Sequence, residues 1–157
     1  MPLIGSVQDR AFIADALATH QTDRTYHAAA HKYVPLMKIN VAQPIKNNTL
    51  GTLVVAEEAV RAKVASFTLI STDKAVNPTN VMGASKRLAE CICQMVSLNQ
   101  TKTRFSMVRF GNVLGSSGSV VPLFKKQIAS GGPVTLTHQD VTRYFMTIGE
   151  AVRTSDR

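Results

Sequence analysis

Short apolar runs alternate along the chain with longer segments that mix apolar and polar residues, and this alternation predicts an α/β fold. In four of the longer segments apolar residues recur every three or four positions, as they do on one face of a helix. These predicted helices span residues 10–19, 49–63, 81–99 and 120–130. The two central helices are expected to turn eight large apolar residues inward: Leu50, Leu53, Val54, Val60, Leu88, Ile92, Met95 and Val96.

The short runs are rich in β-branched and aromatic residues, which predicts strands at residues 25–30, 66–71, 104–110 and 134–137. A strand followed by a helix and then by another strand favours a parallel sheet with right-handed connections. The length of 157 residues is that of one domain that can bury a core.

The net charge of +8 is high for this length and suggests an acidic partner. Nucleic acid is disfavoured, because the basic residues are scattered and form no block of five. An acidic membrane surface or a phosphorylated small molecule stays open. No apolar run is long enough to cross a membrane, and the N-terminus lacks a signal-peptide pattern, so we expect no membrane segment and a cytoplasmic location.

The cysteine and histidine positions argue against a metal site. Cys91 and Cys93 lie two apart on a predicted helix, so their side chains should diverge, and no second cysteine pair completes a zinc site. The four histidines show no spacing typical of ligands. The cysteines are expected to be reduced, partly buried thiols.

The run of residues 71–86 concentrates chemistry at the end of a predicted strand and the start of a helix. Strand ends of this kind open onto the ligand crevice of an α/β sheet. The run contains hydroxyl groups, a carboxylate and two lysines. Its second lysine, Lys86, follows Met82 by one helical turn, which is the spacing of a Tyr-x-x-x-Lys pair with methionine in place of tyrosine. This pattern predicts a site that moves protons on a sugar.

One expected feature of a dinucleotide-binding fold is missing from the sequence. Such a fold opens with a strand and a glycine-rich loop whose helix meets the pyrophosphate. No loop of this kind precedes residue 25, and Gly111, Gly115 and Gly118 have the wrong spacing. Either the fold is a different one, or its first βαβ unit lies outside this sequence.

Several motifs in order closely resemble the nucleotide-sugar 4,6-dehydratases of the CapD-like polysaccharide-biosynthesis group, in the extended short-chain dehydrogenase/reductase superfamily. The resemblance covers residues 5–151. The motifs that carry it span residues 27–35, 47–52, 71–78, 82–86, 109–122 and 142–147. The methionine form resembles large bacterial members that act on UDP-N-acetylglucosamine.

The resemblance implies a Rossmann-like, doubly wound parallel sheet that is incomplete, without its first βαβ unit and glycine loop. It divides the chain into a truncated NAD(P)-binding domain, residues 1–130, and the start of a substrate-binding region, residues 131–157. The complete enzyme is expected to be a homo-oligomer, and complete relatives are often anchored on the cytoplasmic face of the inner membrane.

The chemistry that the resemblance implies is oxidation at C4 of a UDP-sugar, elimination of water across C5 and C6, and return of the hydride to C6. Lys74 is then the base at C5 and Asp73 the acid at C6. A lysine base needs a lowered pKa, and an acid such as Asp73 needs a raised one. On spacing alone, the same two residues could equally be an exposed ion pair.

Lys86 is expected to hold the ribose of NAD or NADP, which the enzyme recycles. Met82 has no group that titrates, so the C4 hydroxyl proton needs another route. Thr72 is the nearest candidate, with ordered water or Asp73 as alternatives. Met82 could equally be a plain core residue at the start of the helix.

The resemblance also suggests further contacts on the cofactor and the substrate. The cofactor set adds Asp9, Ala28, Ala29, Ala30, Ser71 and Val113, and the substrate set consists of Lys32, Asn112 and Arg143. Backbone N–H groups in the loop of residues 111–119 could face anions, or the loop could be a simple turn. The competing interpretation of the whole chain is an inactive remnant or an interaction module without catalysis.

Overall fold

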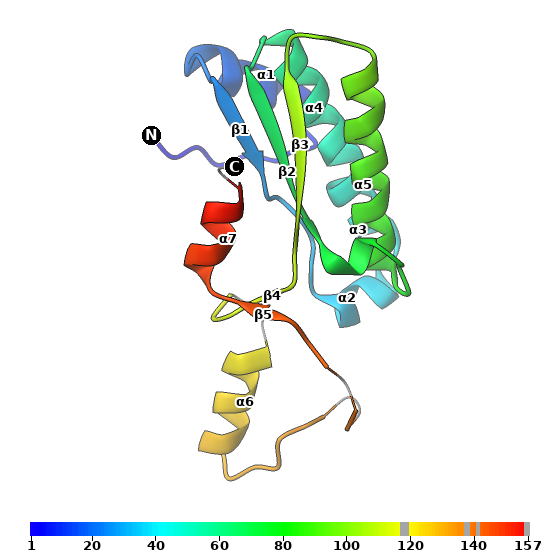
Figure 1. Cartoon of the computed structure of the whole chain (residues 1–157), viewed down its shortest axis with the longest axis vertical. Coiled ribbons are helices and arrows are strands. Elements are labelled where there is room, and N and C mark those ends of the chain that lie inside the picture. Colours follow the sequence, from blue (N-terminus) through cyan, green and yellow to red (C-terminus); the bar gives the residue numbers. More distant parts are fainter. Residues whose placement is uncertain (117–119, 137–138, 141, 156–157) are drawn as a thin grey trace. The chain divides into compact units, whose positions relative to one another are not determined.

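The computed structural model describes residues 1–116, 120–136, 139–140 and 142–155, which form two compact units, Met1–Arg109 and Phe110–Arg157. The larger unit carries most of the elements (Figure 1). They are α1 (Arg10–Thr19), β1 (Arg24–His27), α2 (Val34–Ile39), α3 (Ala42–Pro44), the π-helix η1 (Ile45–Leu50), α4 (Gly51–Arg61), β2 (Ser66–Thr72), the 3₁₀ turn η2 (Asp73–Ala75), α5 (Val81–Leu98) and β3 (Arg104–Phe110).

The strands β1, β2 and β3 form a sheet in that order, with β2 in the middle. Strand β1 runs parallel to β2, with Arg24 opposite Ser66 and His27 opposite Leu69. The connection between them passes through α2, α3, η1 and α4, as expected for a parallel crossover. The predicted α/β fold with a parallel, Rossmann-like sheet is confirmed, and the sheet is a partial one.

One face of this sheet is covered by α1, α4 and α5 (Figure 1). Phe67 and Leu69, at alternate positions of β2, point into the core, because successive side chains of a strand face opposite sides. The helices supply small and medium side chains to the same cluster: Leu17, Val55, Ala56, Ala59, Ala89 and Cys93. The opposite face of the sheet carries Tyr26, which is exposed, and Thr68, whose hydroxyl lies 2.8 Å from that of Ser106.

The predicted core stripes of the two central helices were wrong in part, although Val96 does pack against the core. Leu50, Leu88 and Met95 are about half exposed, whereas the neighbouring small or polar residues are buried. In α5 the buried residues are Met82, Gly83, Ser85, Lys86, Ala89, Glu90 and Cys93. Small side chains let the helix approach the sheet closely, and the buried polar groups find hydrogen-bond partners there.

Several predicted boundaries also moved. The first strand ends at His27, so Ala28–Ala30 follow the strand instead of ending it. The helix predicted at 49–63 is preceded by the π-helix η1, and α4 begins at Gly51. Residues 134–136 form no strand, and Thr137, the last residue of that predicted strand, lies outside the described residues.

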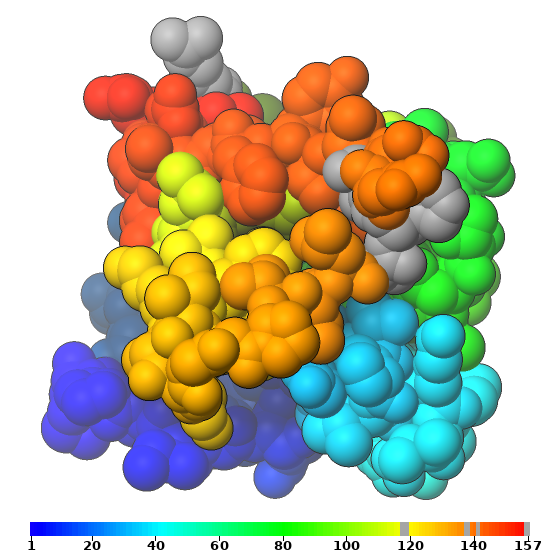
Figure 2. All heavy atoms as spheres, turned by 90° about the horizontal axis from the view of Figure 1, so that it is seen from below, coloured from blue at the N-terminus to red at the C-terminus, as the bar shows by residue number. Residues whose placement is uncertain are grey.

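The segment between β1 and η1 lies at the surface of the larger unit. In α2, Met37 is buried, whereas Leu36 and Ile39 are 56% and 78% exposed. Figure 2 shows atoms of this segment, in light blue and cyan, at the surface. Apolar residues of α2 therefore face both ways, which explains why the sequence pattern does not predict this short helix.

The smaller unit contains β4 (Asn112–Val113), α6 (Val120–Ala129), β5 (Phe145–Met146) and α7 (Ile148–Ser155). Strands β4 and β5 pair in parallel, with Asn112 opposite Phe145. The division of function between residues 1–130 and 131–157 stays a prediction. Among the helices that the structure describes, none has the length and apolarity needed to cross a membrane.

Candidate active site

The carboxyl end of β2 carries a continuous set of hydrogen bonds. The Thr72 hydroxyl donates to Asp73 Oδ1 over 2.9 Å, and Lys74 Nζ donates to the same oxygen over 2.9 Å. Thr72 also caps the η2 turn by accepting a 3.4 Å bond from the backbone N–H of Lys74. The turn therefore brings the three adjacent side chains onto one oxygen atom, where a proton can pass between them.

The electrostatics of Asp73 differ from what a proton donor requires. Burial by itself would raise the pKa of its carboxyl group, but the hydrogen bonds from Lys74 and Thr72 outweigh this effect and lower the pKa. Asp73 is therefore ionised beside Lys74. The expectation of a raised pKa does not hold while the ion pair is closed, and the pair must open before Asp73 can donate a proton.

The first turn of α5 packs directly against this segment. Asn80 caps the helix, and its side chain accepts a 3.0 Å bond from the backbone N–H of Gly83. A Cβ atom added to Gly83 would lie 2.4 Å from the carbonyl oxygen of Lys74. The glycine in the Met82–Lys86 motif is therefore required by the close approach of the helix to the Asp73–Lys74 turn.

Lys86, one turn further along α5, is buried with its ammonium group bonded to the sheet. Its Nζ atom donates to the carbonyl oxygen of Ile70 over 2.7 Å. Burial lowers the pKa of Lys86 to about 8, and the negative groups near it only partly oppose this effect. Met82 is buried as well, so its side chain serves core packing, whatever else it does.

A second buried cluster, which the sequence did not reveal, lies one turn beyond Lys86. Glu90 Oε1 accepts a 2.6 Å bond from the Ser71 hydroxyl and a 2.9 Å bond from Arg109 Nε. Its Oε2 atom accepts from Arg109 Nη2 over 2.7 Å and from Arg87 Nη1 over 3.0 Å. Burial would raise the pKa of Glu90, but these bonds, led by the one from Arg109, lower it to about 2. In the sequence, Glu90 could have been recognised from its position four residues after Lys86, which puts both on one face of the helix.

Asn48, in the π-helix η1, was not among the predicted site residues, although it lies within the family motif of residues 47–52. Its side chain is fully buried and pairs with the backbone of His31, accepting from the N–H over 2.7 Å and donating to the carbonyl over 2.9 Å. It also donates to the Ser85 hydroxyl over 3.0 Å. The amide therefore ties the segment after β1 to α5, beside Lys86. A π-helix often marks a functional position.

The neighbouring His27 closes this network. Thr52 donates its hydroxyl proton to the carbonyl of Asn48 over 2.7 Å, so the Nε2 atom of His27, 3.0 Å away, must carry the proton that reaches Thr52 Oγ1. Burial, assisted by the positive charge of Lys86, lowers the pKa of His27 to about 4. His27 is therefore a neutral, structural histidine.

The other predicted residues of the larger unit have different surroundings. Asp9 caps α1 by accepting a 3.1 Å bond from the backbone N–H of Phe12, which gives it a structural role. Ala28–Ala30 and Lys32 lie between β1 and α2, on the segment that Asn48 fixes. Ser71 directs its hydroxyl proton to Glu90, so toward a cofactor it can only accept a hydrogen bond.

The smaller unit holds two of the predicted substrate residues, one on β4 and one just before its partner strand β5. Asn112 begins β4, and its backbone N–H donates to the carbonyl of Tyr144 over 2.9 Å. Arg143 is exposed just before β5, and Val113 follows Asn112 in β4. Residues 117–119 of the predicted anion-facing loop lie outside the described residues.

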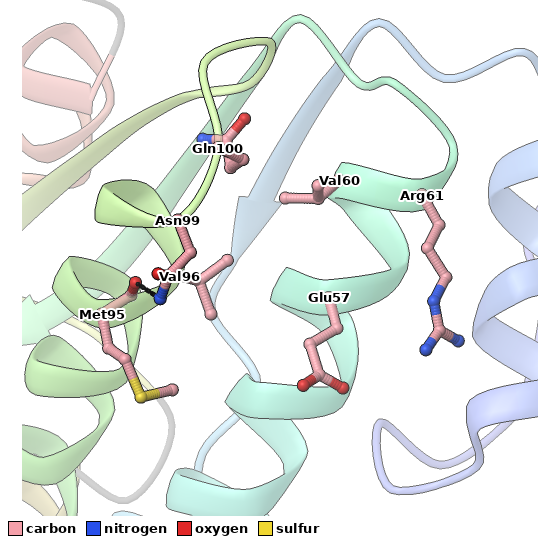
Figure 3. Close-up of a pocket in the computed structure, with 7 residues that line it drawn as sticks. All are labelled: Glu57, Val60, Arg61, Met95, Val96, Asn99 and Gln100. Atoms are coloured by element: carbon pink, nitrogen blue, oxygen red, sulfur yellow. Dashed lines mark hydrogen bonds between the residues drawn. The ribbon is translucent and has the colours of Figure 1, made fainter.

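One surface hollow of the larger unit is remote from these groups. It lies between the ends of α4 and α5 and is lined by Glu57, Val60, Arg61, Met95, Val96, Asn99 and Gln100 (Figure 3). Met95 is nine residues beyond Lys86, a rise of about 14 Å along the helix. The hollow holds none of the hydrogen-bonded acid and base groups found at the carboxyl end of β2, so the candidate site is that end of the strand. Within the described ranges, no three His, Cys, Asp or Glu residues gather as metal ligands.

Comparison with known proteins identifies relatives over nearly the whole chain. The capsular polysaccharide biosynthesis protein CapD of Staphylococcus aureus is 57% identical over 153 residues, which are 98% of this chain and 26% of CapD. The UDP-glucose 4-epimerase of Rickettsia canadensis is 40% identical over 153 residues, which are 95% of this chain and 44% of that enzyme. The chain thus spans about a quarter to a half of the length of these relatives.

Solved structures show the same fold. Pen from Bacillus thuringiensis is 33% identical with a TM-score of 0.93, and the match covers 98% of this chain and 48% of Pen. DesIV from Streptomyces venezuelae, a dTDP-glucose 4,6-dehydratase with NAD bound, is 20% identical with a TM-score of 0.86, covering 95% of this chain and 51% of DesIV. The family model of the polysaccharide biosynthesis proteins matches residues 1–154. The chain therefore belongs to the polysaccharide biosynthesis protein family.

Proposed function

We propose that this chain carries the catalytic segment of a nucleotide-sugar 4,6-dehydratase that acts on UDP-N-acetylglucosamine. The observation that carries the proposal is the hydrogen-bonded set of Thr72, Asp73 and Lys74 at the carboxyl end of β2, with Lys86 on the adjoining helix. Elimination of water requires one group that takes a proton from C5 and another that gives a proton at C6. Lys74 and Asp73 supply this pair.

The residues at this edge of the sheet fit a nicotinamide cofactor. The Lys86 ammonium is a donor for ribose hydroxyls, and the small side chains of Ala28–Ala30 leave room beside the end of β1. Asp9, Ser71 and Val113 complete the proposed cofactor set. When bound, the cofactor accepts a hydride from C4 of the sugar and returns it to C6. Both NAD and NADP fit these contacts.

The Thr72–Asp73 bond offers a route for the C4 hydroxyl proton that does not need a tyrosine. Thr72 Oγ1 takes this proton while passing its own proton to Asp73 Oδ1, 2.9 Å away. Protonation removes the negative charge of Asp73 and gives its carboxyl group the proton that it later donates at C6. Met82 then needs no chemical role, in agreement with its burial.

The remaining proton transfers balance within the same pair. Neutral Lys74 takes the proton from C5, and Asp73 gives its proton to the C6 hydroxyl, which leaves as water. Lys74 then returns its proton to C5, so both residues recover their starting states. Lys74 must be neutral at the outset, so its ammonium group has to release one proton to solvent as the substrate binds, which ends its ion pair with Asp73.

On the substrate side, Asn112 and Arg143 are the proposed contacts with the UDP diphosphate, and Lys32 is a proposed substrate-side lysine. Arginine presents a planar fork that matches phosphate oxygens, and asparagine adds an amide donor. Arg143 is exposed, and its Nη1 atom donates to the carbonyl of Thr142 over 2.9 Å, which leaves other guanidinium donors for an anion.

A second candidate is a UDP-sugar 4-epimerase, which the 40% identity with the Rickettsia canadensis enzyme favours. An epimerase also oxidises C4 but eliminates no water, so it has no use for an acid and a base at C5 and C6. The presence of Asp73 and Lys74 side by side therefore favours the dehydratase.

The test is incubation of the chain with UDP-N-acetylglucosamine and NAD or NADP, followed by mass spectrometry of the nucleotide sugar. We expect a 4-keto product that has lost one water. Lys74→Met should abolish this product, whereas Lys38→Met, a matched change at an exposed lysine of α2, should leave it unchanged. An epimer of unchanged mass would favour the second candidate, and full dehydration by Lys74→Met would refute the assigned base. Lack of any turnover would favour a non-catalytic module.

A further inference from the structure

Glu90 is a buried ionised group that the proposed reaction does not use. Its side chain is 2% exposed, yet both of its oxygens are fully occupied by donors from β2, β3 and α5. A carboxylate in this state has no proton to give and no free lone pair for a ligand. Its role must therefore lie in what it holds in place.

The bonds of Glu90 and Lys86 form a two-point attachment of α5 to the end of β2. Lys86 and Glu90 are four residues apart, so they lie on the same face of the helix. Their partners, the carbonyl of Ile70 and the hydroxyl of Ser71, are adjacent on β2. The two bonds lie one turn apart on the helix and one residue apart on the strand. Together they fix the position of α5 along its axis and its rotation about that axis.

Arg109 extends this attachment to the third strand. Its guanidinium group grips Glu90 through two parallel bonds, from Nε and Nη2, which is the strongest geometry for such a pair. Arg109 lies near the end of β3, so the carboxylate joins two strand ends to one helix. Single surface ion pairs contribute little to the stability of the fold. Removing one partner of a buried ion pair destabilises the fold strongly, because the other charge is left buried and unpaired.

We propose that Glu90 is a positioning residue, a fixed anion that joins Ser71 and Arg109 and thereby holds the Lys86 ammonium against Ile70, in place for the cofactor. This inference rests on the proposed role of Lys86 in cofactor binding. Glu90 also supplies negative charge one turn from the ammonium group.

The charged and titratable groups around Lys86 come from three elements. They are Glu90, Arg87 and Cys93 on α5, His27 on β1 and Arg109 on β3. Burial raises the pKa of Cys93 to about 12, so its thiol is neutral when Lys86 titrates. His27 is neutral in the same range. Glu90 is therefore a negative group that raises the pKa of Lys86 at neutral pH.

The test compares Glu90→Gln with Glu58→Gln by NMR of isotope-labelled lysine side chains in the whole chain. Glu58 is a matched control, since it is also buried and bonded to two arginines, Arg10 and Arg61, but lies on α4. In Glu90→Gln we expect faster exchange of the Lys86 ammonium protons and a fall in the pKa of Lys86. The expected fall is at least about 0.5, from one charge at roughly 6 Å even with water-like screening.

Glu58→Gln should leave both Lys86 signals as in the wild type. If Glu90→Gln fails to fold, Ser71→Ala removes only the bond to β2 and should still speed the exchange. Unchanged Lys86 exchange and titration in a folded Glu90→Gln or Ser71→Ala variant would overturn the inference. These signals need no catalysis, so absence of dehydration would count against the proposed function alone. Weaker NADH binding by Glu90→Gln than by Glu58→Gln would add direct support.

Discussion

The buried histidine of β1 makes stability depend on pH in a defined window. His27 is 4% exposed, and burial, with the charge of Lys86, lowers its pKa from 6.5 to about 4. Above pH 6.5 the ring is neutral in both the folded and the unfolded chain, so it adds no pH dependence. Between pH 6.5 and 4 the unfolded chain binds the proton more readily, and folding stability falls as the pH falls.

The magnitude follows from the difference between the two pKa values. A gap of about 2.5 pH units, at about 1.4 kcal/mol per unit, corresponds to a loss on the order of 3 kcal/mol by pH 4. His27→Gln keeps a donor for Thr52 but cannot be protonated, so this loss should disappear from its pH profile.

The assay is urea unfolding of the wild type and His27→Gln at several pH values from 4 to 7. We expect the difference in unfolding free energy between the two proteins to change by on the order of 3 kcal/mol across this window. His20→Gln, at the exposed end of α1, is the control and should keep the wild-type profile. Parallel curves for wild type and His27→Gln would refute the reasoning, as would a His27 ring that titrates near pH 6.5 by NMR.

Two further substitutions test how the candidate site is held. Asn48→Ala removes three bonds to His31 and Ser85 and should lower the unfolding free energy by about 3 kcal/mol. Its control, Asn40→Ala, removes one exposed bond to Leu36 and should lower the unfolding free energy by less than about 1 kcal/mol. Equal losses of the two variants in urea unfolding would contradict the role of the network. Gly83→Ala places a methyl group against the Lys74 carbonyl and should destabilise the chain by about 1 to 3 kcal/mol and shift the backbone NMR signals of residues 73–75. Gly149→Ala, where a Cβ meets no atom within 4 Å, is its control, and a Gly83→Ala variant as stable as Gly149→Ala would rule out the close contact.

The sequence predicted the order of the longer helices and the three sheet strands of the larger unit because hydrophobic periodicity is a local property. The helix at residues 10–19 and the strand at 104–110 have the predicted bounds, and α5 ends one residue early. Motif order was enough to indicate the family and to draw attention to residues 71–86. In these cases the information lies within one or two turns of chain.

The tertiary structure decided which face of each helix is buried and which polar residues meet. Leu88 and Met95 face outward, while Lys86, Glu90 and Ser85 are buried, because their partners come from β2, β3 and η1. A sequence pattern that assigns large apolar residues to the core cannot anticipate such partners, since they are distant in the chain.

The same reason explains the state of the proposed catalytic pair. The sequence by itself placed Asp73 and Lys74 next to each other at a strand end, where the resemblance assigns them acid and base roles. Only the folded η2 turn decided that Lys74 and Thr72 share one Asp73 oxygen and lower the pKa of its carboxyl group. Residue identity and order are local and can be read along the chain, whereas burial, charge state and hydrogen bonding depend on neighbours that folding brings together.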